Sequence, residues 1–359
     1  MLPIIHICLI RYSSMGDVVL QTSLIAALKQ SYGDKLKITF VTSKEFKTLL
    51  DDHPLIDEVI SFDRSKEVYR LFLKRIKKIY CFDFIFDLHA TLRSKLFRMK
   101  FCSVPSLTVD KRTLEREIFC KTKIKLFKVS NDAQVRRLIY DFKQILGLAN
   151  FDEISSFVST IIKAPKSIDQ LTTSKYSFYK VQSNTPIISI IPTASFFYKR
   201  WAIESFVSLT KQILECEKFK NYEIKILAGP DDNFCSVFDE IALSSNGRVE
   251  NLQGKTSLDE SCEIVAKSSL VVGNDTGLIH VAESLGINVI DIFGPTHEFF
   301  GFGPYLKDSH FLSANESCSP CSSKGNKKCH RDQHYCMLNI EAQTILSKMQ
   351  ESIDAATYL

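Results

Sequence analysis

The chain has 359 residues, of which 45% are hydrophobic and 24% are charged. This length and balance exclude a disordered protein and predict two globular domains of ordinary size. No run approaches the roughly 18 consecutive apolar residues that a membrane-spanning helix needs. The apolar segment at residues 1–10 has no basic residue before it, which favours a first buried strand over a signal peptide and predicts a cytoplasmic protein.

Positive charge is concentrated in one part of the chain. Residues 64–137 contain 20 lysines and arginines against 7 aspartates and glutamates, although the whole chain has a net charge of only +5. Such a basic region suits a polyanionic partner, namely a phosphorylated lipid, an anionic membrane surface or a nucleic acid. A set of solvated helix faces is the alternative interpretation.

The first half of the chain alternates short apolar runs with segments of helical periodicity. This alternation predicts βαβ units and a mostly parallel sheet. Strands are predicted at residues 4–10, 37–41, 57–62 and 82–88, and helices at residues 18–30, 65–80, 92–101 and 131–147.

A segment rich in Ser, Thr, Lys and Pro then interrupts the pattern, and we place an interdomain linker at residues 171–186. A second α/β series follows the linker. Its predicted strands are at residues 187–191, 222–229, 270–273 and 288–294, and its helices at residues 201–214, 277–286 and 340–356. The sequence therefore predicts two doubly wound Rossmann-like domains that face each other across a cleft, with ligands at the carboxyl ends of the strands.

The first predicted strand leads into RYSSMGDVVL, a tight turn of small residues before a helix. Backbone N–H groups and the helix dipole make such a turn an anion site, and Gly16 and Asp17 lie where the helix begins. The turn lacks the G-x-G-x-x-G pattern, and the chain has no phosphate-binding P-loop, which argues against an NAD-dependent dehydrogenase and a P-loop nucleotidase. Asp17 is either a functional carboxylate or an acid that stabilises the start of a helix.

A second turn lies in the segment VVGNDTGLIHVAES. Gly273 ends a strand, Asp275, Thr276 and Gly277 form the turn, and His280 lies on the following helix. The helix N-terminus and the small residues let a diphosphate come close. His280 follows Thr276 by four positions, so both face one side of the helix, and a phosphate contact is favoured over a structural histidine.

A third loop, in the segment IIPTASFFYKRW, follows the strand at residues 187–191. Thr193 and Ser195 lie in this loop, and Lys199 and Arg200 come directly before a helix. Cations at the carboxyl end of a strand are well placed against a leaving diphosphate. A solvated basic loop is the alternative interpretation.

The chain has 11 cysteines, an odd number that argues against a secreted disulfide scaffold. Cys318, Cys321, Cys329 and Cys336 cluster near the C-terminus. The C-x-x-C start is typical of a structural zinc site, whereas the second pair has a spacing unlike a standard zinc knuckle. A reduced, packed loop and a disulfide formed on isolation are the alternatives, and no catalytic metal is predicted.

Several segments in this order resemble glycosyltransferase family nine, the ADP-heptose:lipopolysaccharide heptosyltransferases. They are RYSSMGDVVLQT, FDLHATLRSKL, IIPTASFFYKRW, LQGKTSL, GNDTGLIHVAESLG and FGPT, and the cysteine loop resembles the heptosyltransferase II branch. The resemblance implies an α/β protein of the GT-B fold, with an acceptor domain at residues 1–170, a donor domain at residues 187–338 and a C-terminal helix at residues 339–359. It also implies inverting transfer of heptose from ADP-heptose to the lipopolysaccharide inner core, with no metal or cofactor required.

The resemblance implies roles for individual residues as well. Asp17 matches the family's general base, and Lys199 matches a lysine that binds the donor diphosphate. The other positions that match donor-binding residues are Gly16, Thr193, Ser195, Thr256, Asp275, Thr276, Gly277 and His280. Arg93 and Lys95 are the candidate acceptor contacts. The partners expected are a nucleotide-sugar donor and an anionic lipopolysaccharide core at the cytoplasmic face of the inner membrane, with peripheral membrane contact and no nucleic acid.

Other interpretations stay open at this stage. The chain could use another nucleotide-sugar donor or glycan acceptor, or it could be an inactive relative that only binds a sugar nucleotide. A nucleic-acid-binding protein with a zinc module would explain the basic region and the cysteines. It would leave the DTGLIH turn without a purpose, and the presence of Asp17, Lys199 and Asp275 argues against an inactive relative.

Overall fold

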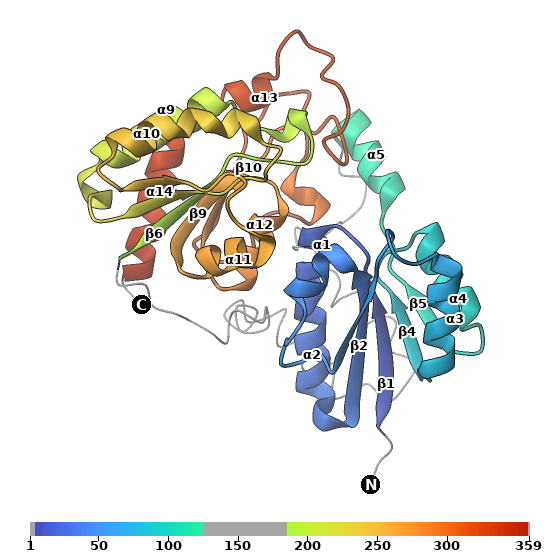
Figure 1. The fold of residues 1–359 in the computed structure, drawn as a ribbon. Helices are drawn as coiled ribbons and strands as arrows, with labels where there is room; N and C mark the ends of the chain where they lie inside the picture. Colours follow the sequence, from blue (N-terminus) through green and yellow to red (C-terminus); the bar gives the residue numbers. More distant parts are fainter. Residues whose placement is uncertain (1–3, 125–184, 358–359) are drawn as a thin grey trace. The chain divides into compact units, whose positions relative to one another are not determined.

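The computed structural model describes residues 4–124 and 185–357, which form two compact units (Figure 1). Within these ranges, the first unit ends at Lys111, and the second comprises residues 112–124 and the residues from Thr185 onward. The helix predicted at residues 131–147 and nearly all of the predicted linker at residues 171–186 lie outside the described residues.

The first unit is built on a five-stranded parallel sheet in the order β3-β2-β1-β4-β5. Its strands are β1 (Ile5–Ile10), β2 (Leu36–Ser43), β3 (Glu58–Phe62), β4 (Phe84–Asp87) and β5 (Ser106–Thr108), and its helices are α1 (Met15–Leu20), α2 (Thr22–Tyr32), α3 (Tyr69–Ile79) and α4 (Leu92–Lys100). Every residue of β2 except Lys37 is buried, as expected for a parallel strand covered on both faces.

Helices α3 and α4 pack on one shared core. Phe72 and Ile76 of α3 and Phe97 of α4 lie in a single apolar cluster with Ile10 of β1 and Ile85 of β4. Both helices therefore cover the same face of the sheet, where Figure 1 shows them beside each other.

The helix predicted at residues 18–30 is divided into α1 and α2 at Gln21. At this point the Thr22 hydroxyl donates a hydrogen bond to the Val19 carbonyl oxygen at 2.7 Å. A hydroxyl that bonds back to the preceding turn competes with the helical pattern and bends helices. The division therefore coincides with a local side-chain bond that hydrophobic periodicity does not report.

The second unit is built on a six-stranded parallel sheet in the order β11-β10-β9-β6-β7-β8. Its strands are β6 (Ile187–Ile191), β7 (Glu223–Ile226), β8 (Val249–Asn251), β9 (Ser268–Asn274), β10 (Val289–Ile292) and β11 (His310–Leu312). Its helices are α5 (Thr113–Thr122), α9 (Ile203–Glu215), α10 (Phe238–Ser244), α11 (Leu258–Ala266), α12 (Gly277–Ser284), α13 (Tyr335–Leu338) and α14 (Ala342–Thr357). All residues of β6 and β10 are buried.

Helix α5 belongs to the second unit although it precedes residue 170, where we placed the end of the N-terminal domain. The ring of Phe119 lies 5.0 Å from that of Phe299, and the Arg116 guanidinium donates a hydrogen bond to the Phe300 carbonyl oxygen at 3.1 Å. Just after the helix, the Lys123 ammonium donates to the Cys318 carbonyl oxygen at 2.7 Å. The second unit is therefore assembled from separate stretches of the chain.

Each sheet has one point at which the strand order reverses direction. It lies between β1 and β4 in the first unit and between β6 and β9 in the second. In doubly wound sheets, ligands bind beyond the carboxyl ends of the strands at this switch point. The predicted α/β class with two doubly wound sheets is confirmed, and the loops after β1, β4, β6 and β9 are where a site is expected. Across the described part of the chain, no helix has the length and apolar character to span a membrane.

Candidate active site

The loops after β1 and β4 are joined at the switch point of the first sheet. The Arg11 guanidinium donates a hydrogen bond to the Leu88 carbonyl oxygen at 2.5 Å, and the Tyr12 amide donates to Nδ1 of His89 at 3.0 Å. Burial, together with the positive charges of Arg11 and Lys111, lowers the pKa of His89 to about 4. His89 is therefore neutral at pH 7 and can accept the Tyr12 bond.

Asp17 lies at this junction, in the first turn of α1 and directly after the buried Gly16. Its Oδ2 atom is 2.6 Å from the Arg11 guanidinium and accepts hydrogen bonds from the Ser14 hydroxyl at 2.7 Å and the Ser14 amide at 3.2 Å. Burial alone would raise the pKa of Asp17, but Arg11 and the Ser14 hydrogen bonds outweigh it and hold the pKa below its usual value. Asp17 is therefore an ionised carboxylate with one oxygen fixed by three donors.

The two candidate acceptor contacts lie on α4, the helix that follows β4. The Arg93 guanidinium lies 5.5 Å from the ring centres of Tyr12 and Phe62 and 5.7 Å from that of Tyr69, so aromatic rings hold it in place. Lys95 is exposed on the surface of the same helix. Their role in binding an acceptor stays a prediction.

At the switch point of the second sheet, the buried Asn274 joins the loops after β6 and β9. Its side-chain amide donates to the Pro192 carbonyl oxygen at 2.8 Å, and its oxygen accepts from the Trp201 amide at 2.8 Å. A buried amide that both donates and accepts a hydrogen bond holds its two partners in place, because breaking either bond would leave a buried polar group unpaired. Asn274 therefore sets the position of the loop that carries Lys199.

Lys199 and Asp275 form a largely buried ion pair at this point. The Lys199 ammonium lies 2.5 Å from Oδ2 of Asp275, and their side chains are 15% and 9% exposed. The Thr296 hydroxyl donates to the same oxygen at 3.4 Å, and Nε2 of the buried His280 lies 3.8 Å from the other oxygen of Asp275. Three predicted residues from two separate segments, Lys199, Asp275 and His280, are thus brought together. Thr296, which lies in the FGPT segment but was not predicted as a site residue, joins them.

The remaining predicted donor-binding residues lie in the loops after β6 and β9 and at the start of α11. Thr276 precedes α12 in an extended conformation, and Gly277 is the first residue of the helix. Thr193 is half-buried and Ser195 is exposed in the loop after β6. The described contact of Thr256 is with the Ser261 hydroxyl at 2.9 Å, at the start of α11, and does not reach the Lys199 pair. A donor-binding role for these residues stays a prediction.

Asp291, in the middle of β10, is a site residue that sequence analysis missed. Its side chain is fully buried, and both carboxyl oxygens lack a hydrogen-bond partner. Burial, with the neighbouring negative charges of Asp275 and Glu283, raises its pKa well above the usual value. Burial therefore favours the protonated form of Asp291. Its position as an acid inside the apolar run NVIDIF is the sequence pattern that could have indicated a buried acid.

Asp291 should make the stability of the protein depend on pH. A buried acid with a raised pKa binds a proton in the folded state that it lacks in the unfolded state, so stability falls as the pH rises above the unfolded pKa of about 3.9. The loss is about 1.4 kcal/mol per pH unit until the folded pKa is reached. Asp291→Asn removes this titration. We expect the melting temperature of the variant, relative to the wild type, to increase as the pH rises above about 4, whereas a constant difference would contradict a raised pKa of Asp291.

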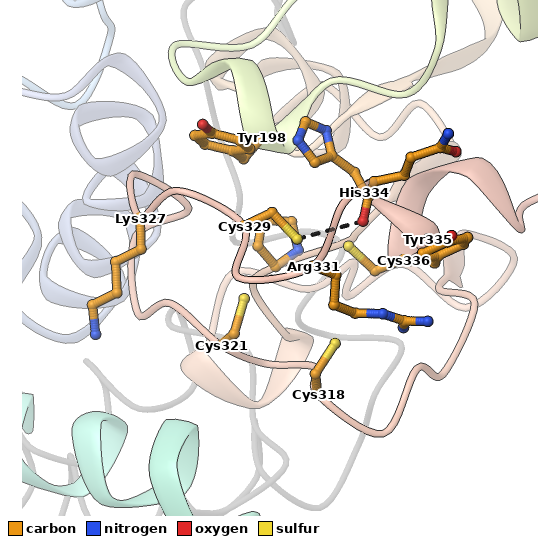
Figure 2. A pocket seen from close by; sticks show the side chains of 11 residues that line it. Tyr198, Cys318, Cys321, Lys327, Cys329, Arg331, His334, Tyr335 and Cys336 are labelled. Atoms are coloured by element: carbon orange, nitrogen blue, oxygen red, sulfur yellow. Dashed lines mark hydrogen bonds between the residues drawn. The ribbon is translucent and has the colours of Figure 1, made fainter.

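The four C-terminal cysteines line one small pocket together with Tyr198, Arg331 and His334 (Figure 2). All four are free thiols. Burial, with the proximity of the other three cysteines, raises the pKa of Cys336 to about 12. Among the described residues, no group of three or more His, Cys, Asp or Glu side chains is arranged to hold a metal ion. The structural zinc at Cys318, Cys321, Cys329 and Cys336 therefore stays a prediction, and the reduced, packed loop stays the alternative.

The loop that carries the four cysteines also packs against the side chain of Lys199. Gly325 has a positive φ of 77°, and a Cβ atom added to it would lie 2.3 Å from Cγ of Lys199. Only glycine fits here, because a side chain would collide with the stem of the lysine and the backbone conformation would be strained. The cysteine loop is therefore part of the wall that positions the Lys199 ammonium.

Two doubly wound parallel sheets, each with charged side chains at its switch point, are the architecture of the GT-B fold. The solved structure of E. coli ADP-heptose LPS heptosyltransferase II has this fold and matches with a TM-score of 0.66 at 18% identity, over 98% of this chain and 100% of that chain. E. coli heptosyltransferase WaaC with ADP matches with a TM-score of 0.67 at 16% identity, over 97% and 100% of the two chains.

Sequence comparison narrows the class to one family. The model of glycosyltransferase family 9 (heptosyltransferase) matches residues 71–330. Lipooligosaccharide heptosyltransferase 2 of Campylobacter jejuni is 24% identical over 342 residues, which cover 93% of this chain and 94% of the relative. The chain belongs to glycosyltransferase family 9, the heptosyltransferases, as the sequence resemblance predicted.

Proposed function

We propose that this enzyme transfers heptose from ADP-heptose to the inner core of lipopolysaccharide, with inversion at the anomeric carbon and without a metal ion. The observation that carries the proposal is the buried Lys199–Asp275 ion pair at the second switch point, directly before the N-terminus of α12. The names of the relatives, which are lipooligosaccharide and lipopolysaccharide heptosyltransferases, support this substrate class.

In the donor half, negative charge develops on the departing diphosphate. Lys199 supplies a fixed cation, and the backbone N–H groups at Thr276 and Gly277 supply a helix N-terminus that favours an anion. Such prearranged charges stabilise a leaving group in the transition state without needing to reorganise. Residues 187–338 contain no D-x-D pair of the kind that holds a catalytic divalent cation in other glycosyltransferases, so we assign the neutralising role to Lys199.

In the acceptor half, the Asp17 carboxylate accepts the proton of the attacking hydroxyl. Its lowered pKa keeps it ionised at neutral pH, as a base must be. The described contacts of Asp17 all involve Oδ2, and we assign proton transfer to Oδ1. Attack from the face opposite the diphosphate then produces inversion.

The acceptor itself is assigned to the basic first unit. A phosphorylated lipid core carries negative charge at the cytoplasmic face of the inner membrane, where anionic lipids attract basic segments. Arg93, held by three rings, presents a fixed guanidinium suited to phosphate or carboxylate, and the exposed Lys95 adds a second cation. The proposed enzyme is therefore a cytoplasmic, peripheral membrane protein.

Nucleotide binding tests the donor assignment. We expect ADP and ADP-sugars to raise the melting temperature in the presence of EDTA, and UDP and GDP to raise it less. At about 100 times its dissociation constant, a ligand adds roughly 2.7 kcal/mol to the free energy of unfolding, which a thermal-shift assay detects readily. An absolute requirement of sugar transfer for Mg²⁺ or Mn²⁺ would contradict the metal-free mechanism, and a stronger response to UDP or GDP would contradict the choice of donor.

A further inference from the structure

Helix α4 has an apolar stripe on its outer face. Its inner face is buried through Ser94 and Phe97, yet Leu92, Leu96 and Met99 are 74%, 41% and 61% exposed. Positions separated by four and seven residues lie on one side of a helix, so these three side chains form a continuous stripe. Single exposed leucines are ordinary, whereas an aligned group of large apolar side chains marks a contact surface.

The stripe is surrounded by positive charge. Lys95 and Lys100 flank it on α4, and both are exposed. On α3, Leu71, Lys74 and Lys78 are exposed and follow the same helical spacing. The sequence has no acidic residue in either segment, residues 68–82 or residues 88–109. Two acids just outside these segments pair with other cations of the helices, Glu67 with Arg75 at 3.0 Å and the buried Asp87 with Arg98 at 3.0 Å. The surface therefore combines apolar side chains with lysines and contributes no carboxylate of its own.

The outer faces of the two helices form one surface. The Tyr69 hydroxyl near the start of α3 donates to the Arg93 carbonyl oxygen near the start of α4 at 2.8 Å. At the other end, the Lys77 ammonium lies 4.9 Å from the ring centre of Phe101, just after α4. Because both helices pack their inner faces on one core, their outer faces point away from it together. We call Leu71, Lys74, Lys78, Leu92, Lys95, Leu96, Met99 and Lys100 the α3–α4 surface.

We infer that the α3–α4 surface docks on an anionic lipid bilayer, with Leu92, Leu96 and Met99 inserted at the level of the head groups and the lysines paired with lipid phosphates. Helices that lie in a membrane interface have this composition, an apolar face bordered by lysine and arginine. A surface that binds single-stranded nucleic acid combines cations with aromatic side chains on which bases stack, whereas the side chains of this stripe are not aromatic. A second copy of the chain would bring like charges together.

The inference deepens the proposed function, because it gives the enzyme a means of reaching a lipid-linked acceptor. It also distinguishes two contributions to membrane binding, namely electrostatic attraction by the lysines and insertion of the apolar stripe. Charge brings the protein to the surface and weakens with salt, whereas insertion of the stripe does not. The stripe is therefore expected to retain the protein on vesicles at salt concentrations that screen the lysines.

The test uses the full chain and co-sedimentation with vesicles of equal parts phosphatidylcholine and phosphatidylglycerol. One variant carries Leu92→Gln, Leu96→Gln and Met99→Gln, which keep helix propensity and change exposed positions. A matched control carries Leu114→Gln, Leu243→Gln and Leu338→Gln, whose leucines are 74%, 87% and 45% exposed elsewhere in the chain. We expect the stripe variant to lose more than about tenfold in vesicle affinity, and the control to bind like the wild type.

A second variant, Lys74→Gln with Lys78→Gln, should weaken binding at low salt, and its difference from the wild type should shrink at high salt. Wild-type affinity in the stripe variant would overturn the inference. So would gel filtration showing a wild-type dimer that the stripe variant alone cannot form, because the stripe would then bind a second copy.

Transfer of heptose to delipidated core oligosaccharide separates the inference from the proposed function. The stripe variant should retain wild-type transfer to this soluble acceptor. If no protein transfers heptose while the stripe variant still loses vesicle binding, the proposed function fails and the docking surface stands. If transfer is normal and vesicle binding is unchanged, the docking surface fails alone.

Discussion

Replacement of Asp17 by asparagine is expected to lower the rate of sugar transfer by about 10²- to 10⁴-fold, the usual cost of losing a general base. The amide has the shape of the carboxylate and suits the start of a helix, but it cannot take a proton from the acceptor. ADP affinity should be unchanged, because the ADP-binding group is assigned to Lys199, Asp275 and α12 in the other unit. Initial rates and ADP titrations of the purified variant measure both effects.

Arg11→Gln is the matched control for this experiment. It breaks the same ion pair and keeps the carboxylate, so it should retain far more activity than Asp17→Asn. Loss of the arginine also removes the main charge that lowers the pKa of Asp17, so the acid limb of the pH–rate profile should move to higher pH. Asp17 would be excluded as the base if the folded Asp17→Asn protein transferred sugar at more than about a tenth of the wild-type rate.

The ion pair at Asp17 also predicts a pH dependence of stability. An acid whose folded pKa is lowered contributes stability above its unfolded pKa, and this contribution disappears as the pH falls through the folded value. The melting temperature of Asp17→Asn should therefore fall below that of the wild type near pH 7, and the two should converge in acid. This comparison distinguishes a lost ion pair from a misfolded variant, which would stay less stable at every pH.

Lys199→Met is expected to reduce turnover by about 10²- to 10³-fold, because one fixed charge at a developing anion is typically worth a few kcal/mol. Methionine keeps most of the apolar stem that packs against the cysteine loop at Gly325. The acceptor KM should change little, since the acceptor is assigned to the first unit. Single-turnover rates with excess enzyme would report the chemical step directly.

The Lys199 variant leaves the Asp275 carboxylate largely buried without its ammonium partner, which itself destabilises a protein. Lys199→Met combined with Asp275→Asn removes the unpaired charge and should recover stability but not turnover. Lys199→Arg keeps the charge and should retain part of the rate. Near wild-type turnover in Lys199→Met would show that the lysine is only a structural partner of Asp275.

Much of the fold could be predicted because its central strands are long apolar runs separated by helical periods. Strands β5, β8 and β11 were missed, since three residues are too few to show a pattern. The first helical segment was predicted as one helix, whereas the structure divides it at Gln21, beside the Thr22 hydrogen bond, and hydrophobic spacing does not report such a local feature.

The candidate site could be predicted where the sequence places small residues and charges directly after a strand, as at Asp17, Lys199 and Asp275. The partners of these residues could not be predicted in the same way. Arg11 lies in the same motif as Asp17, but only the folded turn shows that its guanidinium reaches the carboxylate. Asp291 becomes notable only when burial and neighbouring acids are known, because an acid within a strand more often faces solvent.

Helix α5 has a practical consequence for dividing the protein into fragments. A donor-domain fragment that starts at residue 185 would omit this helix and would uncover Phe299 and Phe300, which it covers in the intact chain. Such a fragment is expected to aggregate and to be poorly soluble even if its sheet is complete. A synthetic peptide of residues 112–124, added in trans, supplies the missing wall through Phe119 and Lys123. The second unit is therefore suited to fragment complementation, in which the short peptide restores the missing helix.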